Sequence, residues 1–269
     1  MFQRKVNITR IKNGRESEEI DTVLIEAPID IILNSEPLVN IICLPHDLKP
    51  MAIGFLFSIG IINSVDDIKE ITINDLEGKI DIKLNNSIES VSKNLNLNPV
   101  SRVIDTTCGI PSPWRNIMKN SLDHSKADLF SKMDIKLNPD IIHRSIIRMQ
   151  KETKLFRETG GCHGAAIFDF KGNLKSVKED IGRHNAIDKV IGDLLLQKEQ
   201  FDNKFLTSTG RLTGDSVLKA IRAKIPIVAS LSAAIESGIR LAFGYGITLI
   251  GFARGNRMNI YSHPNRLLI

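Results

Sequence analysis

The C-terminal half of the chain alternates helical segments with short apolar runs, and this alternation constrains the fold more than any other feature of the sequence. The first helix is expected to begin at Asn138-Pro139 and to end at Gly160-Gly161, with a capping residue, an N-terminal proline and terminal glycines. A hairpin is predicted over 164–180, further helices over 184–198, 215–224 and 233–246, and buried strands over 204–210, 225–232 and 247–254. This order predicts an α/β sheet covered by helices on both faces.

The first 95 residues predict a smaller α+β region. The expected elements are strands at 20–34 and 38–45, a buried helix at 48–62 and a hairpin at 68–85. Pro28 and Pro37 are expected to break the strands. Between Asn94 and Lys136 no periodicity is visible, which is typical of a functional or disordered segment or of a boundary. We therefore predict two domains, 1–135 and 136–269, the first ending in a mobile loop.

Charge and composition exclude several classes of protein. The formal net charge is +5 with a pI of about 9.1, a mild basic excess that favours acidic ligands. No cluster of lysine and arginine predicts nucleic-acid binding, no apolar run is long enough to cross a membrane, and the charged N-terminus does not resemble a signal peptide. The odd number of cysteines, three, predicts free thiols in a reduced, cytoplasmic protein.

A zinc or other metal site is not expected. The cysteines do not occur in pairs, and the His-x-Glu and Pro-Cys-x-x-Cys runs of zinc deaminases are missing.

Three glycine-containing turns follow predicted strands, and each carries cationic side chains. They are Gly182-Arg183-His184, Gly210-Arg211 and Arg254-Gly255-Arg257. Ligands of such sheets bind where strands end, and backbone N–H groups with arginines suit phosphates. Each turn alone is more simply explained by surface charges. The three together predict a ligand with several phosphates, such as a dinucleotide-like cofactor, although no P-loop or GxGxxG motif is present.

The cysteines differ in their surroundings. Cys108 lies in "DTTCGIPSP", whose glycine and prolines predict an exposed loop suited to a sulfur carrier, with an incidental loop cysteine as the equal alternative. Cys162 adjoins His163, but neighbours on a strand face opposite ways, so we favour Cys162 as a packed side chain and leave His163 open as a pocket residue. Cys43 lies in an apolar strand and is expected in the core.

The run "TGGCHGAAIFDFKGNLKSVKEDIGRHNAIDKVIGDLL" resembles the formate dehydrogenase accessory sulfurtransferase (FdhD) family. The similarity continues through "STGRLTGDSVLKAIRAKIPIVASLSA" and "GITLIGFARGNRMNIYSHPNRL", and reaches back to "IEAPIDIILN". It implies a sulfurtransferase that takes persulfide sulfur from a cysteine desulfurase. The sulfur passes to the molybdenum or tungsten bis(molybdopterin guanine dinucleotide) cofactor of formate dehydrogenase. It also implies a cytidine-deaminase-like, three-layer C-terminal domain without zinc, and a homodimer.

The resemblance also suggests roles for individual residues. Cys108 matches the persulfide-bearing cysteine of the family. The family's cofactor-binding segment matches Phe252, Ala253, Arg254, Gly255, Asn256 and Arg257. We infer from the glycine turns that Arg183, His184 and Arg211 line the same pocket, with His163 beside them.

Three positions depart from the family pattern. Pro111 stands where many members have a second loop cysteine, Ile59 replaces a frequent glutamate, and a Ser-Ala-Pro-Thr turn becomes Ser232-Ala233-Ala234-Ile235. These departures keep open a second hypothesis, a chaperone that binds the cofactor without sulfur chemistry at Cys108. A deaminase-like hydrolase is the third hypothesis, disfavoured because the metal residues are missing.

Overall fold

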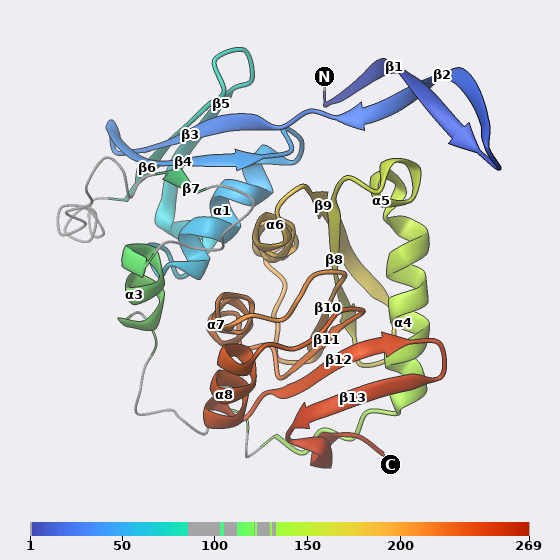
Figure 1. The fold of residues 1–269 in the computed structure, drawn as a ribbon. Coiled ribbons are helices and arrows are strands. Elements are labelled where there is room, and N and C mark those ends of the chain that lie inside the picture. The colour runs from blue at the N-terminus through green and yellow to red at the C-terminus, as the bar shows by residue number, and fades with distance from the viewer. Residues whose placement is uncertain are drawn as a thin grey trace.

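The computed structural model describes residues 2–85, 103–104, 112–120, 122, 130 and 133–268. Cys108 and residues 105–111 of its predicted loop, 105–113, lie outside the described residues, whereas Ser112 and Pro113 begin a helix instead. Two sheets and a projecting hairpin carry the fold, with helices between and around the sheets (Figure 1).

The N-terminal region contains a two-stranded hairpin, a five-stranded sheet and helix α1. Its elements are β1 (Gln3–Lys12), β2 (Arg15–Leu24), β3 (Ala27–Leu33), β4 (Glu36–Cys43), α1 (Leu48–Ser58), a 3-10 turn (Val65–Asp67), β5 (Ile68–Asn74), β6 (Lys79–Leu84), β7 (Val103–Ile104) and α3 (Ser112–Asn120). Among the described strands, β1 and β2 pair only with each other, and the larger sheet has the order β5-β6-β3-β4-β7.

The prediction that prolines break the first strands was wrong. Pro28 and Pro37 lie inside β3 and β4, which pair with each other. Pro28 is the second residue of its strand, and Pro37 lies at a register shift of the β3–β4 ladder, two places where a missing N–H is tolerated. The expected strand 20–34 is divided instead at residues 25–26, between β2 and β3.

The C-terminal region forms a six-stranded mixed sheet of order β13-β12-β11-β10-β8-β9. Its elements are α4 (Pro139–Glu152), α5 (Lys154–Thr159), β8 (His163–Asp169), β9 (Leu174–Asp180), α6 (Arg183–Leu196), β10 (Lys204–Ser208), α7 (Gly214–Arg222), β11 (Ile227–Ser230), α8 (Glu236–Tyr245), β12 (Thr248–Arg254), β13 (Arg257–Ser262) and a 3-10 turn (Pro264–Arg266).

Helices cover both faces of this sheet, as the alternation predicts. Ala166 and Phe168 of β8 pack with α4, whereas Ala165 and Ile167, their neighbours in the strand, face the cluster that contains α6 and α7. The mixed α/β class is therefore confirmed, whereas the likeness to cytidine deaminases stays a prediction. No helix within the described part of the chain is long and apolar enough to cross a membrane.

Three element boundaries differ from the sequence-based expectation. The long helix expected over 138–161 is broken at Thr153, because the Glu179 carboxylate accepts hydrogen bonds from the N–H groups of Leu155 and Phe156 and starts α5 separately. Helix α6 begins at Arg183, one residue before the expected start at 184, with Gly182 as its cap. Strand β13 was missed, so the turn 255–256 joins two antiparallel strands.

Part of the segment without periodicity is helical. Helix α3 carries Trp114, which is fully buried and packs edge-on against Phe55 of α1 with 5.4 Å between ring centroids. With nine residues, α3 is shorter than the window of about 11–18 residues over which a helical period is recognised in a sequence.

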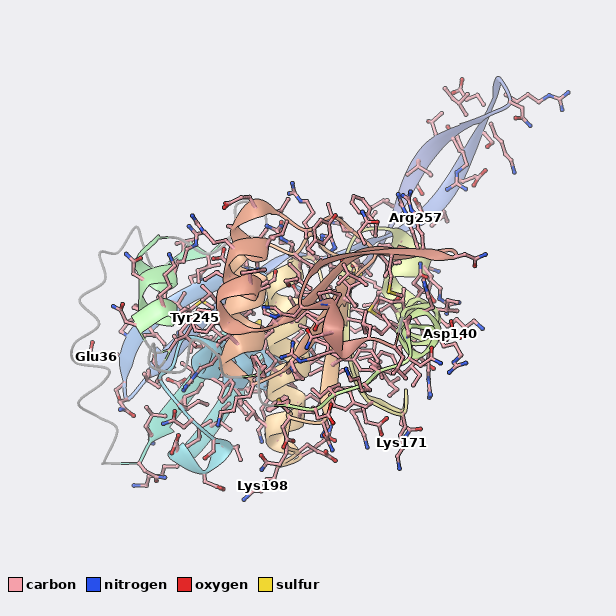
Figure 2. The ribbon with its side chains drawn as sticks, turned by 90° about the horizontal axis from the view of Figure 1, so that it is seen from below. Glu36, Asp140, Lys171, Lys198, Tyr245 and Arg257 are labelled. Atoms are coloured by element: carbon pink, nitrogen blue, oxygen red, sulfur yellow. The ribbon has the colours of Figure 1, made fainter. Side chains whose placement is uncertain are left out.

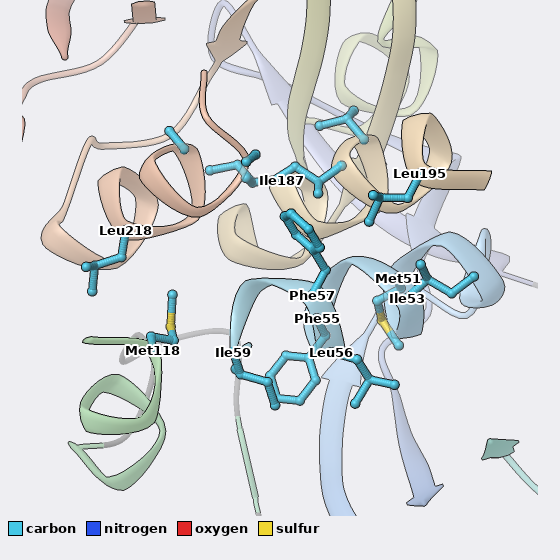
Figure 3. Close-up of a cluster of buried hydrophobic side chains, with 14 of the residues drawn as sticks. Met51, Ile53, Phe55, Leu56, Phe57, Ile59, Met118, Ile187, Leu195 and Leu218 are labelled. Atoms are coloured by element: carbon cyan, nitrogen blue, oxygen red, sulfur yellow. The ribbon is translucent and has the colours of Figure 1, made fainter. Parts of the chain in front are cut away.

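Helices α1 and α6 cross at two glycines, and this crossing joins the two halves of the chain. A Cβ at Gly54 would lie 1.9 Å from the carbonyl oxygen of Asp188, and one at Gly192 would lie 1.9 Å from that of Pro50. One hydrophobic cluster consequently includes Phe57 of α1 and Ile187 of α6 (Figure 3). The division into two domains at residue 136 stays a prediction.

Candidate functional site

The sheet brings the three cationic turns to one of its edges. Strands β10, β11 and β12 run parallel, so their carboxyl ends meet there. Strand β8 is antiparallel to β10, which places His163 at the same edge, and His163 is paired with Asp180 at the end of β9. The turns after β9, β10 and β12 therefore share the edge that commonly binds ligands in α/β folds.

The turn after β9 is held by the buried carboxylate of Asp180. Its oxygens accept hydrogen bonds from the N–H of Gly182 at 2.8 Å and of Leu44 at 3.1 Å, and from the side-chain amide of Asn185 at 3.0 Å. Lys189 completes the set with an ion pair of 2.7 Å. Asp180, Asn185 and Lys189, which belong to the most distinctive sequence motif, thus hold the turn and the end of β4 together.

A second buried pair lies deeper in the same motif. The Lys219 ammonium of α7 binds both carboxylate oxygens of Asp188, and the hydroxyl of Ser58 donates to one of them at 2.7 Å. This network ties α1, α6 and α7 behind the edge.

Arg183 lies across the turn after β10. A Cβ at Gly210 would come within 2.8 Å of the Arg183 Cβ and 3.1 Å of its Cδ, so only glycine leaves room for this side chain. Burial, and then the charge of Arg211, lower the pKa of Arg183. Its buried Nε has no hydrogen-bond partner among the described residues. Arg211 itself is exposed.

A cavity of about 330 Å³ opens beside Arg183, at the N-terminus of α7. Four cationic side chains line it: Arg115, Lys119, Arg183 and Arg240. Asp215, also in the lining, forms two hydrogen bonds with the Arg115 guanidinium, of 2.6 and 3.0 Å. Such a cavity suits an anionic group.

The Arg115–Asp215 pair fixes α3 to α7. Because α3 begins at Ser112, this pair positions the chain directly downstream of the segment that contains Cys108. Sequence reasoning missed both residues: Arg115 lies in the segment without periodicity, and Asp215 resembles an ordinary acidic residue in the first turn of a helix.

Burial disfavours the charged form of both histidines of the site. The His163 Nδ1 lies 3.2 Å from the Thr209 hydroxyl oxygen, which also accepts from the N–H of Gly164. Burial, and then Arg183, lower the pKa of His163. His184 is only 8% exposed, and burial followed by the charge of Lys219 lowers its pKa to about 3. Neither ring nitrogen of His184 has a hydrogen-bond partner within the described residues.

Two arginines beside the turn between β12 and β13 approach the aromatic ring of Phe252, near the end of β12. Phe252 has a positive φ of 51°, and its N–H donates to the Ser232 carbonyl at 2.9 Å. The guanidinium carbons of Arg254 and Arg257 lie 5.8 and 5.9 Å from the centre of the Phe252 ring. The pair of cations and the ring can contact both phosphate and a planar base.

The other residues predicted in this segment differ in exposure. Ala253 is buried in the sheet, whereas Gly255 and Asn256 are exposed. The six-residue run is therefore contiguous in the chain, but only part of it can contact a ligand at the surface.

The two described cysteines are poor nucleophiles. Cys43 is fully buried, and burial raises the pKa of its thiol. Burial, followed by the nearby Glu179 carboxylate, raises the pKa of Cys162 to about 12. Both were predicted to be packed in the interior, and both are buried. Cys43 belongs to the larger hydrophobic cluster, whereas the Cys162 thiol donates to a Glu179 carboxylate oxygen at 3.7 Å. Within the described residues, no three potential metal-ligating side chains cluster.

Comparison with known proteins finds relatives along almost the whole length of this chain. A family model described as FdhD/NarQ matches residues 24–268. The chain is 34% identical to the sulfur carrier protein FdhD of Sulfolobus acidocaldarius over 98% of both chains, and 32% identical to that of Bacillus subtilis over 97% of this chain and 96% of the relative. A crystal structure described as a formate dehydrogenase accessory protein from Desulfotalea psychrophila superposes with a TM-score of 0.78, at 30% identity and full coverage of both chains.

Proposed function

Because the chain belongs to the FdhD/NarQ family, we propose that it carries sulfur from a cysteine desulfurase to the cofactor of formate dehydrogenase. The names of its relatives support one element of this proposal, a sulfur carrier role in formate dehydrogenase maturation. The desulfurase, the molybdenum or tungsten bis(guanine dinucleotide) cofactor and the residues that act on them are our proposal.

The observation that carries the proposal is the state of the thiols. Cys43 and Cys162 are buried with raised pKa values, so Cys108 is the remaining thiol of the chain. In the proposed step, the Cys108 thiolate attacks the outer sulfur of a persulfide on the desulfurase. The sulfur–sulfur bond breaks, the desulfurase thiolate leaves, and Cys108 holds the outer sulfur as a persulfide. No net oxidation or reduction is required.

The cofactor is the receiving substrate, and the cationic edge suits it. Its guanine would stack on Phe252, and its phosphates would meet the guanidinium groups of Arg254 and Arg257. The buried Nε of Arg183, without a described partner, offers a further donor beside the cavity. Burial lowers the pKa of His163 and of His184, which disfavours a positive charge on either imidazole.

The second hypothesis, a cofactor-binding chaperone, rests on a different observation. Every feature of the edge is built without Cys108, and Pro111 replaces the second loop cysteine of many family members. On this hypothesis the cofactor binds, and Cys108 carries no sulfur.

Sulfur loading distinguishes the two hypotheses. The protein would be incubated with an active cysteine desulfurase and cysteine, without reductant, and its peptides weighed by mass spectrometry. We expect the Cys108 peptide to gain one sulfur atom, in the wild type and in Cys162→Ala alike. An unmodified Cys108 peptide, with the desulfurase active on a control protein, would favour the chaperone.

Ligand binding tests the cationic edge. Calorimetric titration with guanosine diphosphate is expected to show binding that Arg254→Ala and Arg257→Ala each weaken about tenfold or more. The matched control is Lys171→Ala, because Lys171 lies in the β8–β9 turn at the opposite edge of the sheet, away from Arg257 (Figure 2). Equal affinity in all variants would contradict the assignment of this edge.

A further inference from the structure

The cavity beside Arg183 takes its cationic side chains from three different helices. Arg115 and Lys119 belong to α3, Arg183 is the first residue of α6, and Arg240 belongs to α8. Arg115 and Lys119 are four residues apart, so they share one face of α3. The wall of the cavity therefore contains two cations of α3 and two cations of the C-terminal half.

This positive charge is only partly compensated. Among the described residues that line the cavity, Asp215 is the only acid, and its carboxylate already accepts two hydrogen bonds from Arg115. Lys119 and Arg183 form no ion pair with a described residue. The nearest acid to Arg240 is Glu236 at 3.8 Å, but their side chains are 75% and 76% exposed, so water screens the attraction. A bound anion would remove the repulsion among these cations.

Two helices begin beside the cavity without a side-chain cap. Gly214 opens α7, Ser237 is the second residue of α8, and both line the cavity. The N–H of Gly214 donates to the Ser237 hydroxyl at 3.1 Å, which holds the two helix ends together. Neither N-cap residue, Thr213 of α7 or Ile235 of α8, forms a side-chain cap hydrogen bond. The positive ends of both helix dipoles therefore add to the attraction of the four cations.

Arg183 also carries a donor that the described residues leave unused. Its Nε is buried without a hydrogen-bond partner, although buried N–H groups normally have one. The side chain is confined by the turn at Gly210, where a Cβ would lie 2.8 Å from the Arg183 Cβ. An oxyanion in the cavity would supply the missing acceptor.

We propose that this cavity binds a phosphate-like oxyanion, which fastens α3 to the C-terminal half. The anion accepts hydrogen bonds from Arg183 and attracts Lys119 and Arg115 across the cavity. A group with two or more negative charges matches the excess of cations best. Neither sulfur transfer nor the formate dehydrogenase cofactor enters this argument, so the proposal stands apart from the proposed function.

Anion binding and the anchoring of α3 are coupled on this proposal. Helix α3 is already held by Trp114, which packs on Phe55, and by the pair of Arg115 with Asp215. The anion adds a third attachment, and by reciprocity a firmly held α3 raises the affinity for the anion. Because α3 begins at Ser112, the anion also fixes the chain directly downstream of the segment that contains Cys108.

Hydrogen–deuterium exchange of the full chain tests the proposal, with inorganic pyrophosphate as the probe. Sodium chloride holds the ionic strength constant, so that general screening does not change during the titration. We expect saturable protection of peptides that cover 112–120, with exchange slowed about threefold or more. Trp114 is the only tryptophan of the chain and lies in α3, so its fluorescence follows the same titration and gives the Kd.

Lys119→Gln and Arg240→Gln each remove one cation from the cavity. Both side chains are exposed, so both variants should fold, and each should raise the pyrophosphate Kd about fivefold or more. Arg148→Gln is the matched control, an exposed arginine on α4 at the other face of the sheet, and should bind as the wild type does. A wild type without saturable binding, or an unchanged Kd in both cavity variants, would overturn the proposal.

Asp215→Asn should change the two measurements in opposite directions. Arg115 loses the carboxylate that it pairs with, so α3 should exchange faster than in the wild type when no anion is present. The cavity loses its negative charge, so pyrophosphate should bind about fivefold more tightly and restore the protection of α3. A faster exchange that saturating pyrophosphate does not reverse would contradict the proposal, because it would show a purely structural role.

The position of the protection separates this cavity from the turn between β12 and β13. Pyrophosphate should protect 112–120, and protection confined to 252–257 would overturn the proposal. Guanosine diphosphate, titrated in the same way, identifies the source of the anion: a lower Kd than that of pyrophosphate indicates the phosphate of a nucleotide, and a higher one indicates a free oxyanion. Sulfur loading of Cys108 does not affect these outcomes, so the two proposals fail separately.

Discussion

At the scale of single residues, burial decides which groups of this protein can react or titrate. The same polypeptide holds thiols and imidazoles whose pKa values are displaced far from those of free side chains. Desolvation of the charged form is the first cause in each case.

Thiol alkylation follows from this difference. At pH 8 and without denaturant, iodoacetamide should leave Cys43 and Cys162 unmodified, because the reactive thiolate is scarce where burial raises the pKa. After unfolding, both should react. Peptide mass spectrometry of the native and unfolded protein measures this, and rapid native labelling of Cys162 would refute the burial argument.

The lowered pKa of His184 predicts that the stability of the protein depends on pH. Its pKa is about 3 in the folded protein, whereas an unfolded histidine takes up a proton below about pH 6.5. Between these values the unfolded chain binds the extra proton. The contribution of the neutral His184 to the free energy of unfolding is therefore fully present above pH 6.5. It is lost as the pH drops toward 3, by up to about 1.4 kcal/mol per pH unit.

His184→Gln removes this titration. Urea unfolding of the wild type and the variant, repeated from about pH 7 down to about pH 4, should show a shallower loss of stability in the variant. Parallel curves would show that His184 is not neutral in the fold.

At the scale of elements, α1 and α6 approach each other closely at two glycines. Backbone of one helix lies where a side chain of the other would begin, at Gly54 and at Gly192. No flexible side chain can move aside there, because the obstructing atoms are carbonyl oxygens of the partner helix.

Adding one methyl group at this contact should therefore be costly. We expect Gly54→Ala and Gly192→Ala each to lower the free energy of unfolding by roughly 3 kcal/mol or more. Gly244→Ala in α8 is the matched control, since nothing lies within 4 Å of its Cβ position, and it should stabilise by about 0.5–1 kcal/mol. Denaturant unfolding compares them, and equal effects at the three sites would contradict the packing argument.

At the scale of the whole molecule, the two halves of the chain share one interior. Residues of α1 and of the five-stranded sheet belong to the same hydrophobic cluster as Ile187, Val190 and Leu194 of α6 (Figure 3). A smaller cluster lies between α4 and the other face of the six-stranded sheet, and all its buried members except Ile135 come from residues 136–269.

A fragment of residues 136–269 tests how far the halves depend on each other. Without α1, the apolar side of α6 would face water, so we expect the fragment to bind a hydrophobic dye and to give poorly dispersed amide NMR signals. The full chain is the reference. A fragment with dispersed signals and cooperative unfolding would establish residue 136 as a true domain boundary.

Local patterns in the sequence determined the class of the fold and the location of the candidate site. Alternating apolar strands and helices indicated a sheet covered on both sides, and glycine turns with arginines indicated its binding edge. These signals are local because burial imposes a period on strands and helices, and turns need particular residues. Where a local rule conflicts with a tertiary contact, as for Pro28, Pro37 and the break at Thr153, the sequence-based expectation was wrong.

Only the tertiary structure decided how distant segments act together. It pairs Arg115 with Asp215 across a hundred residues of chain, sets Arg183 over Gly210, and shows that Asp180, Asn185 and Lys189 hold the site rather than form it. No period or motif encodes such pairs, because each residue's role depends on partners that only folding brings within hydrogen-bond distance. The two faces of the projecting hairpin are likewise known only from the structure, because the register of β1 and β2 determines which side chains share a face.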